Sequence, residues 1–266
     1  MIPIFQFAFG AAAALVFMRQ RRVYRQALRL GASTLETLLN AIDANDEDTG
    51  RHVRRVAQYA LELADAAGLS EREKRSVERV ALFHDIGKIH EALFDILHDQ
   101  TELTPEEWKA VRTHPKRGAE VLDPLCAFYP DLYVGVLSHH ERWDGTGYPR
   151  GIKGLRIPQC ARIVAIADAF DAITHSRLYS RARSLRAARE ALLAGRGTQF
   201  DPDLVDLFLS PLVQESVAGI RIAPGGRGKK LNRRGDRVQS APDLIFRWRP
   251  AKAARRSPRR QPRTAS

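Results

Sequence analysis

Apolar side chains recur at helical spacing through most of the chain. In one segment they fall on a single helix face: Val53, Val56, Ala60 and Leu63. Similar stripes occur in three further segments, residues 76–89, 104–114 and 161–174. No segment of useful length alternates between apolar and polar residues, which is the pattern of a half-buried strand. The hydrophobic pattern therefore predicts an all-α domain, a helical bundle that we place at residues 31–215.

The N-terminal segment differs from this helical domain. Residues 2–18 carry no charged side chain, and five arginines follow within residues 19–29. Seventeen helical residues span roughly 25 Å, which lies in the lower range for crossing the hydrocarbon core of a bilayer. A signal peptide would instead carry its positive charge before the apolar run. We therefore predict a membrane-anchor helix with a basic juxtamembrane segment at residues 1–30. The alternatives are a helix packed on the domain and a misassigned start site.

The positive charge of the chain is concentrated at its C-terminal end. The 266 residues carry a formal net charge of +12. Residues 221–266 contain 15 Lys or Arg and two Asp, a net charge of +13, so that residues 1–220 are nearly neutral at −1. A neutral domain argues against a basic nucleic-acid-binding fold. The Arg-, Pro- and Gly-rich composition of residues 216–266 cannot bury enough apolar surface to fold alone, and we predict a disordered basic tail there.

Ionisable side chains interrupt two of the apolar stripes. His84 and Asp85 lie in the first, and Asp168 lies in the last. Burying such groups is costly unless a metal ion or hydrogen bonds compensate them. Imidazole and carboxylate ligands without thiolate suit iron, manganese or zinc more than copper(I) or a structural zinc site. The interrupted stripes therefore indicate a metal site.

Two pairs of neighbouring residues extend this set. Asp48 and His52 are one helical turn apart, so a carboxylate and an imidazole would lie on the same face. The adjacent His139 and His140 cannot share one helix face, and the glycines and proline of residues 145–151 end any helix that carries them. We expect this histidine pair at a helix end that runs into a shaped loop.

Two sequence motifs resemble those of a known protein family. The stretch "HDIGK" at residues 84–88 resembles the signature of the HD phosphohydrolase superfamily, and "HHERWDGTGYP" at residues 139–149 is similar to the hallmark of its HD-GYP branch. The match continues through "TGRHVRRVA", "LTPEEW", "HPKRGAEVL", "IPQCARIVAIADAFDAIT" and "QFDPDLV", and covers about residues 43–208. The resemblance implies an all-helical fold and a phosphodiesterase that opens cyclic di-GMP to linear pGpG, and in some members continues to GMP.

The resemblance also implies a set of metal ligands. Asp85 would bridge two divalent ions, iron or manganese, and would take part in catalysis with Lys88. Asp48 stands where some members have a glutamate and bind a third ion. We expect two ions, with three as the alternative. The implied ligands are His52, His84, Asp85, His114, His139, His140 and Asp168, to which Asp48 is added for the third ion.

Substrate contacts are implied at two further places. Gly147, Tyr148 and Pro149 would form a guanine-facing wall or a docking surface for diguanylate cyclase domains, with apolar packing of the loop as the alternative. Lys88 would neutralise charge on the phosphoryl group, and Arg177 matches an arginine that contacts a ligand phosphate. The family's basic residue shortly after this arginine is replaced by Ser180, which puts substrate affinity or identity in doubt.

These expectations define the predicted function and its rivals. The expected reaction is metal-dependent hydrolysis of cyclic di-GMP in bacterial second-messenger signalling. The alternatives are a phosphohydrolase of another cyclic dinucleotide or nucleotide, and a catalytically silent cyclic di-GMP binding module. We expect no specific nucleic-acid partner. The apolar N-terminal segment and the basic tail predict attraction to an anionic membrane, with the domain at the cytoplasmic face of the inner membrane or otherwise in the cytoplasm.

Overall fold

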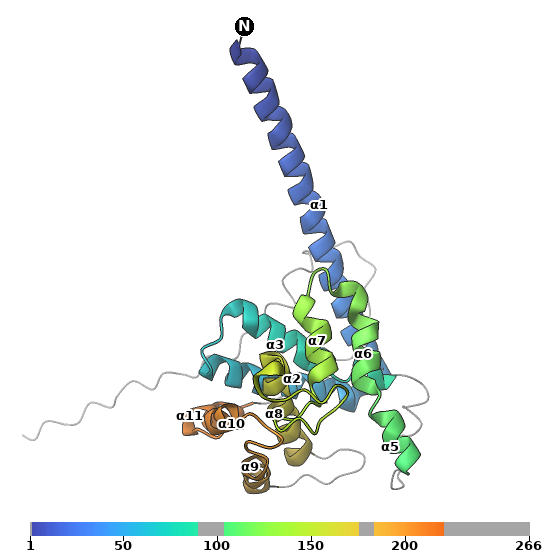
Figure 1. Ribbon diagram of the computed structural model, residues 1–266, viewed down its shortest axis with the longest axis vertical. Coiled ribbons are helices and arrows are strands. Elements are labelled where there is room, and N and C mark those ends of the chain that lie inside the picture. Colours follow the sequence, from blue (N-terminus) through green and yellow to red (C-terminus); the bar gives the residue numbers. More distant parts are fainter. Residues whose placement is uncertain (1, 90–103, 176–183, 221–266) are drawn as a thin grey trace, which may run out of the picture. The chain divides into compact units, whose positions relative to one another are not determined.

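The computed structural model describes residues 2–89, 104–175 and 184–220, and within these ranges the fold is all-α, as predicted. The only β-type pairing in this part of the chain is one isolated bridge between Arg196 and Phe200. The elements, shown in Figure 1, are α1 (Ile2–Asn45), α2 (Glu47–Ala66), α3 (Glu71–Phe83), η1 (Ile86–Ile89), α5 (Pro105–Val111), α6 (His114–Leu122), η2 (Asp123–Leu125), α7 (Pro130–Ser138), η3 (Gly154–Arg156), α8 (Gln159–Thr174), α9 (Leu185–Ala194), α10 (Pro202–Phe208) and α11 (Pro211–Ala218).

The chain divides into two units. One comprises Met1–Glu36 and Asn232–Ser266, and its described part is the N-terminal portion of α1. The other, Thr37–Leu231, contains the remaining helices. The helix expected at residues 1–30 is present but continues without a break to Asn45. None of the described helices combines the length and hydropathy needed to cross a bilayer, so the predicted membrane anchor is not supported.

The predicted C-terminal tail begins inside a helix. α11 continues across residue 215 and ends at Ala218, and residues 221–266, which carry the basic charge, lie outside the described residues.

Three helices form the centre of the larger unit. α2 packs against both α3 and α8, and α3 also contacts α8 (Figure 1). Each of them contributes side chains at 0% exposure, among them Val56, Val80 and Ile163. Phe170 of α8 packs edge to face on Tyr59 of α2 and on Phe208 of α10, with ring centroids 5.2 Å apart in both pairs. The apolar faces recognised in the sequence therefore bury one another.

Local sequence signals fix where the central helices begin. The Asp46 side chain accepts hydrogen bonds from the backbone N–H groups of Asp48 and Thr49 at the start of α2. Ser70 and Glu73 form a capping box at the start of α3. Such caps satisfy backbone N–H groups that have no partner within the helix. They fix the first turn of α2, one turn before His52, and the direction of α3, whose C-terminal end carries His84.

A pair of glycines brings η1 against α6. A Cβ on Gly87 would overlap the carbonyl oxygen of His114 and lie 2.7 Å from the backbone nitrogen of Gly118. Both contacts are with backbone, which cannot move aside as a flexible side chain could. The segment that follows Asp85 can therefore lie against the start of α6, where His114 is, only because residue 87 has no side chain.

Replacing Gly87 by Ala should destabilise the domain by about 1–3 kcal/mol or more, because an added methyl group in a closely packed interior forces backbone shifts. Gly219→Ala is a matched control, since its φ is −80° and its added Cβ would come no closer than 3.4 Å to any neighbour. Urea unfolding followed by circular dichroism measures both variants. Equal midpoints for the two would contradict the steric role of Gly87.

Candidate metal centre

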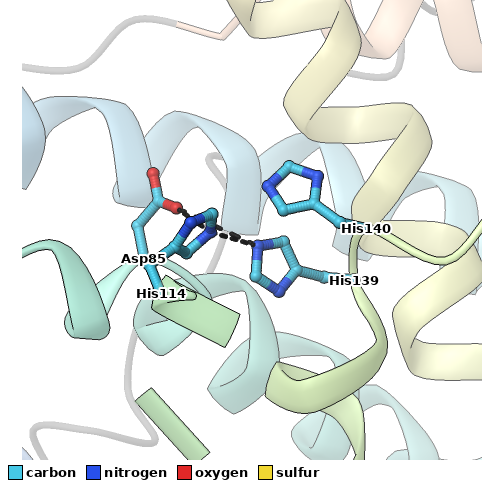
Figure 2. A group of neighbouring side chains, drawn as sticks. All are labelled: Asp85, His114, His139 and His140. Atoms are coloured by element: carbon cyan, nitrogen blue, oxygen red, sulfur yellow. Dashed lines mark hydrogen bonds and ion pairs between the residues drawn. The ribbon is translucent and has the colours of Figure 1, made fainter. Parts of the chain in front are cut away.

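Seven histidine and aspartate side chains converge within the larger unit. His52 comes from the middle of α2 and Asp168 from α8, whereas the other five lie at or just beyond helix ends. Ligand-type atoms lie within 4.8 Å of one another in two groups, and Asp85 belongs to both. The first group is Asp85, His114, His139 and His140 (Figure 2), and the second is His52, His84 and Asp85.

Asp85 divides its two carboxylate oxygens between the groups. Oδ1 lies 3.4 Å from Nε2 of His114 and 4.0 Å from Nε2 of His139. Oδ2 lies 3.4 Å from Nε2 of His84 and 3.8 Å from Nε2 of His52. Each oxygen therefore faces its own pair of imidazoles, which is the arrangement that a carboxylate bridging two cations requires.

Asp168 joins the second group. Its Oδ1 lies 3.3 Å from Nε2 of His52 and 3.9 Å from Nε2 of His84. The second group thus has two imidazoles and two carboxylates, whereas the first has three imidazoles and one carboxylate. Six of the seven residues are buried or nearly so, and Asp168 keeps a side-chain exposure of 19%. Through Asp168 the centre has an edge toward solvent.

Hydrogen bonds to the backbone fix the tautomer of three histidines. Nδ1 of His84 lies 2.8 Å from the carbonyl oxygen of Ala81, three residues earlier. His114 and His139 repeat this contact with the carbonyls of residues 111 and 136, at 2.7 Å and 2.6 Å. Because a carbonyl oxygen only accepts, each Nδ1 carries the hydrogen. The Nε2 lone pairs are therefore left facing the centre.

These contacts also explain why the ligands lie at helix ends. The last carbonyls of a helix have no partner within the helix. His84 follows α3, His114 follows the end of α5, and His139 follows α7, so each ring binds a carbonyl of the turn that precedes it. The same bond satisfies the helix end and orients the ligand.

Several atoms in the centre lack the partner that a buried polar atom needs. Nε2 of His84 and Oδ1 of Asp85 are buried without a hydrogen-bond partner. Nε2 of His114 and Nε2 of His139 are 3.1 Å apart, although both are acceptors in the tautomers fixed above. Two facing lone pairs repel each other unless a cation lies beside them. The donor set therefore fits divalent metal ions, with Asp85 shared between two positions.

The protonation states suit metal binding at neutral pH. Burial lowers the pKa of His114 to about 3 and lowers the pKa values of His139 and His140 well below the ordinary value. Burial alone would raise the pKa of Asp85, but Lys88 and His84 hold it well below its usual range. Neutral imidazoles and an ionised carboxylate are the forms that bind metal, so these groups need to release few protons, whereas His84, whose pKa Asp85 and Asp168 raise, would release one.

The glycine-rich loop covers one side of the histidine pair. The Tyr148 ring stacks on His140 with centroids 5.0 Å apart, and the Arg112 guanidinium lies 5.4 Å from the Tyr148 centroid. The backbone N–H of Tyr148 donates to the carbonyl of His140 at 3.2 Å. A Cβ on Gly147 would lie 2.6 Å from the Cα of Glu141. The loop therefore folds back so closely on the histidine pair that residue 147 must be glycine.

Side-chain and backbone contacts hold this loop in place. Buried Glu141 accepts a hydrogen bond from the backbone N–H of Arg150 at 2.8 Å. The backbone N–H groups of Trp143 and Asp144 donate to the carbonyls of Gln199 and Thr198 at 3.1 Å and 2.8 Å. The loop is thereby joined to the segment that precedes α10.

One residue named from the sequence lies outside both ligand groups, and another lies outside the described residues. Asp48 is exposed in the first turn of α2, pairs with Arg51, and belongs to neither ligand group. Its role as a ligand of a third ion stays a prediction. Arg177 lies outside the described residues. Lys88 is near the centre, with its Nζ 2.7 Å from Oδ2 of Asp85.

Sequence reasoning missed one residue beside the centre. Asp171 is fully buried on α8, three residues after Asp168, and its Oδ2 lies 2.7 Å from Nδ1 of His52. The signal was available, because a second aspartate one helical turn after the first lies in the same apolar stripe.

Comparison with known proteins places the chain in a family. Residues 36–204 match the HD domain family model. The chain belongs to the HD-domain family. It is 41% identical over 191 residues to the cyclic di-GMP phosphodiesterase response regulator RpfG of Xanthomonas campestris, covering 70% of this chain and 50% of that protein. It is 39% identical over 174 residues to 3'3'-cGAMP-specific phosphodiesterase 2 of Vibrio cholerae, covering 65% of this chain and 33% of that protein. The family assignment made from the motifs is confirmed.

The fold has a counterpart among solved structures. A cyclic GMP-AMP specific phosphodiesterase of V. cholerae aligns with a TM-score of 0.51 at 23% identity, covering 70% of this chain and 48% of that one. This likeness confirms the fold. The HD-domain chain spans about half or less of the two curated relatives named above.

The metal-free protein should lose stability between pH 7.5 and pH 5.5. Unfolded histidines titrate near pH 6.5, whereas the folded pKa values of His114, His139 and His140 are lowered, so the unfolded state binds more protons in this window. Each such group costs up to about 1.4 kcal/mol per pH unit below 6.5. Burial would also lower the pKa of His84, but Asp85 and Asp168 raise it, so His84 acts in the opposite direction, as do Glu62 and Glu78, whose pKa values burial raises.

Urea unfolding of chelator-treated protein at the two pH values measures this difference. Asp85 and Asp171 do not interfere, because their pKa values are lowered and their contributions are lost only at lower pH. An equal or higher free energy of unfolding at pH 5.5 would show that the three histidines are not held neutral.

Proposed function

We propose that this HD-domain protein hydrolyses the phosphodiester bond of a cyclic dinucleotide, with cyclic di-GMP as the preferred substrate and linear pGpG as the product. One observation carries the proposal, the division of the two Asp85 oxygens between two imidazole groups. Such a centre fits two divalent ions. When bound, two ions supply hydroxide near neutral pH and neutralise charge on the phosphate.

The chain's own residues provide the rest of the proposed chemistry. The Nδ1 hydrogen bonds hold three Nε2 lone pairs in place before the substrate arrives, so no rearrangement of ligands accompanies the reaction. Lys88 places an ammonium group beside the shared carboxylate, and its side chain keeps an exposure of 25%. It can therefore reach a phosphate at the edge of the centre and stabilise the charge that develops on its oxygens.

The loop at residues 145–151 is the proposed substrate wall. The half-buried Tyr148 ring stacks on His140, and Arg112 lies over the same ring. Burial raises the pKa of Tyr148, with Asp85 and Asp168 contributing, so its hydroxyl remains a hydrogen-bond donor. Gly147 and Pro149 shape the backbone on either side. Arg177 remains a predicted phosphate contact.

A second substrate has specific support. The 39% identical relative is named as a 3'3'-cGAMP-specific phosphodiesterase. Both dinucleotides would present the same phosphodiester to the centre and differ in one purine base. The choice between them therefore lies in the base contacts, and cyclic di-GMP is favoured because the 41% identical relative is named for it.

Metal identity and partners remain predictions. Imidazole and carboxylate donors without thiolate suit iron or manganese, and two ions match the two ligand groups. Docking of diguanylate cyclase domains on the loop rests on the sequence resemblance.

The purified full chain, loaded with Mn²⁺ or anaerobically with Fe²⁺, should convert cyclic di-GMP to pGpG, detected by product chromatography. A parallel assay with 3'3'-cGAMP should give a lower kcat/KM. Asp85→Asn should abolish turnover and reduce bound metal, because the shared carboxylate loses its charge. Asp206→Asn removes an exposed carboxylate paired with Arg196 and should leave both unchanged. Full activity in Asp85→Asn would overturn the proposed function, and a higher kcat/KM for 3'3'-cGAMP would reassign the substrate.

Lys88→Met should lower kcat by about 10²–10³-fold while metal content stays at the wild-type level, since loss of one donor to a developing negative charge typically has this cost. Lys116→Met is the matched control, because Lys116 is exposed and paired only loosely with Glu120 at 3.9 Å. Steady-state kinetics and metal analysis of both variants measure this. An unchanged kcat in Lys88→Met would exclude Lys88 from the reaction.

A further inference from the structure

Asp171 connects the second ligand group to the core of the fold. Its fully buried carboxylate accepts hydrogen bonds from Nδ1 of His52 at 2.7 Å and from Nε and Nη2 of Arg55 at 2.6 and 2.9 Å. His175 lies on the same carboxylate, with its Nδ1 3.1 Å from Oδ1. Three cationic or N–H-bearing groups thus surround one anion between α2 and α8.

This contact distinguishes His52 from the other oriented histidines. His84, His114 and His139 each place Nδ1 against a neutral backbone carbonyl. His52 instead places Nδ1 against a carboxylate. A carboxylate behind a metal-binding imidazole fixes its tautomer and makes the opposite nitrogen more basic, and its loss typically weakens metal affinity 10–100-fold.

The charge around the two groups differs in the same direction. His52 and His84 face two carboxylates, Asp85 and Asp168, and Asp171 lies behind His52. The group containing His114, His139 and His140 includes one carboxylate, Asp85, and Asp168 acts on it only through His140. A cation at the position of His52, His84 and Asp168 would therefore have Asp168 as an additional carboxylate, which remains after Arg55 pairs with Asp171 and Lys88 pairs with Asp85.

We propose that Asp171 is a positioning residue that acts through His52, and that it makes the metal position at His52, His84 and Asp168 the tighter of two unequal positions. Metal would then fill the His52 side first and leave it last. The proposal rests on the metal-binding part of the proposed function and is independent of which dinucleotide is hydrolysed.

The competing explanation is a purely structural one, in which Asp171 serves only as the partner of Arg55 and joins α8 to α2. Asp171→Asn and Arg55→Lys separate the two. Asp171→Asn keeps the side-chain shape but removes the charge behind His52. Arg55→Lys disturbs the bidentate pair between the helices but leaves the carboxylate on His52.

The decisive measurement is equilibrium dialysis of the chelator-stripped full chain against Mn²⁺, with melting temperatures of the metal-free proteins recorded alongside. The wild type should bind two ions with unequal affinities. Asp171→Asn should weaken the tighter affinity 10–100-fold and leave the other unchanged. Arg55→Lys should lower the melting temperature without changing either affinity. Unchanged Mn²⁺ affinities in Asp171→Asn, or an equal loss of affinity in both variants, would show that Asp171 only joins α8 to α2 and would overturn its positioning role.

A second pair of variants tests the inequality even if Asp171→Asn does not fold. His140→Gln removes a ligand from the weaker group and should retain the tighter affinity, whereas His52→Gln should lose it. The reverse result would overturn the proposal. If the wild type binds no Mn²⁺ or Fe²⁺ at all, the proposed function itself fails, whereas two equal affinities defeat only the inequality.

Discussion

A buried carboxylate surrounded by imidazole lone pairs is the interaction on which the rest of the structure depends. Asp85 is nearly inaccessible to water. Three of the histidines that face it carry their hydrogen on Nδ1, where it is bonded to a backbone carbonyl, so that their Nε2 lone pairs face the carboxylate. Such an arrangement is unfavourable by itself, because an ionised group and several acceptors share a dry space. The unfavourable free energy of this burial is confined to the centre, and the apolar contacts of α2, α3 and α8 offset it.

The chain keeps this arrangement rigid with short-range means. Three of the histidines are held by a carbonyl only three residues away, so their ring orientation does not depend on distant packing. His52 lies in mid-helix, where the preceding carbonyls are already bonded within the helix, and it needs a partner from another element. Asp171 of α8 is that partner. The difference between the two kinds of orientation follows directly from where each histidine lies along its helix.

Periodicity and motif spacing predicted the all-α fold, the burial of the histidine and aspartate set, and the helix end at His139. They could not predict that the Asp48 side chain is exposed and paired with Arg51. A spacing of one helical turn from His52 does not fix which way that side chain points. Asp171 was missed for a related reason. The stripe on α8 shows that it is buried, but only the crossing of α2 and α8 shows what it contacts. Pairings across helices are properties of tertiary packing, which one-dimensional spacing does not contain.

The five residues of "HDIGK" have different roles. Two of them offer ligand atoms and one brings a cation, whereas Gly87 offers nothing to the chemistry and instead sets how near two stretches of backbone can come. A sequence signature of this kind therefore also sets a distance between two backbone segments. A homologue that kept both ligands and the lysine but carried a larger side chain at the glycine would read as an intact catalytic motif, while its two halves of the centre would stand too far apart to share one carboxylate.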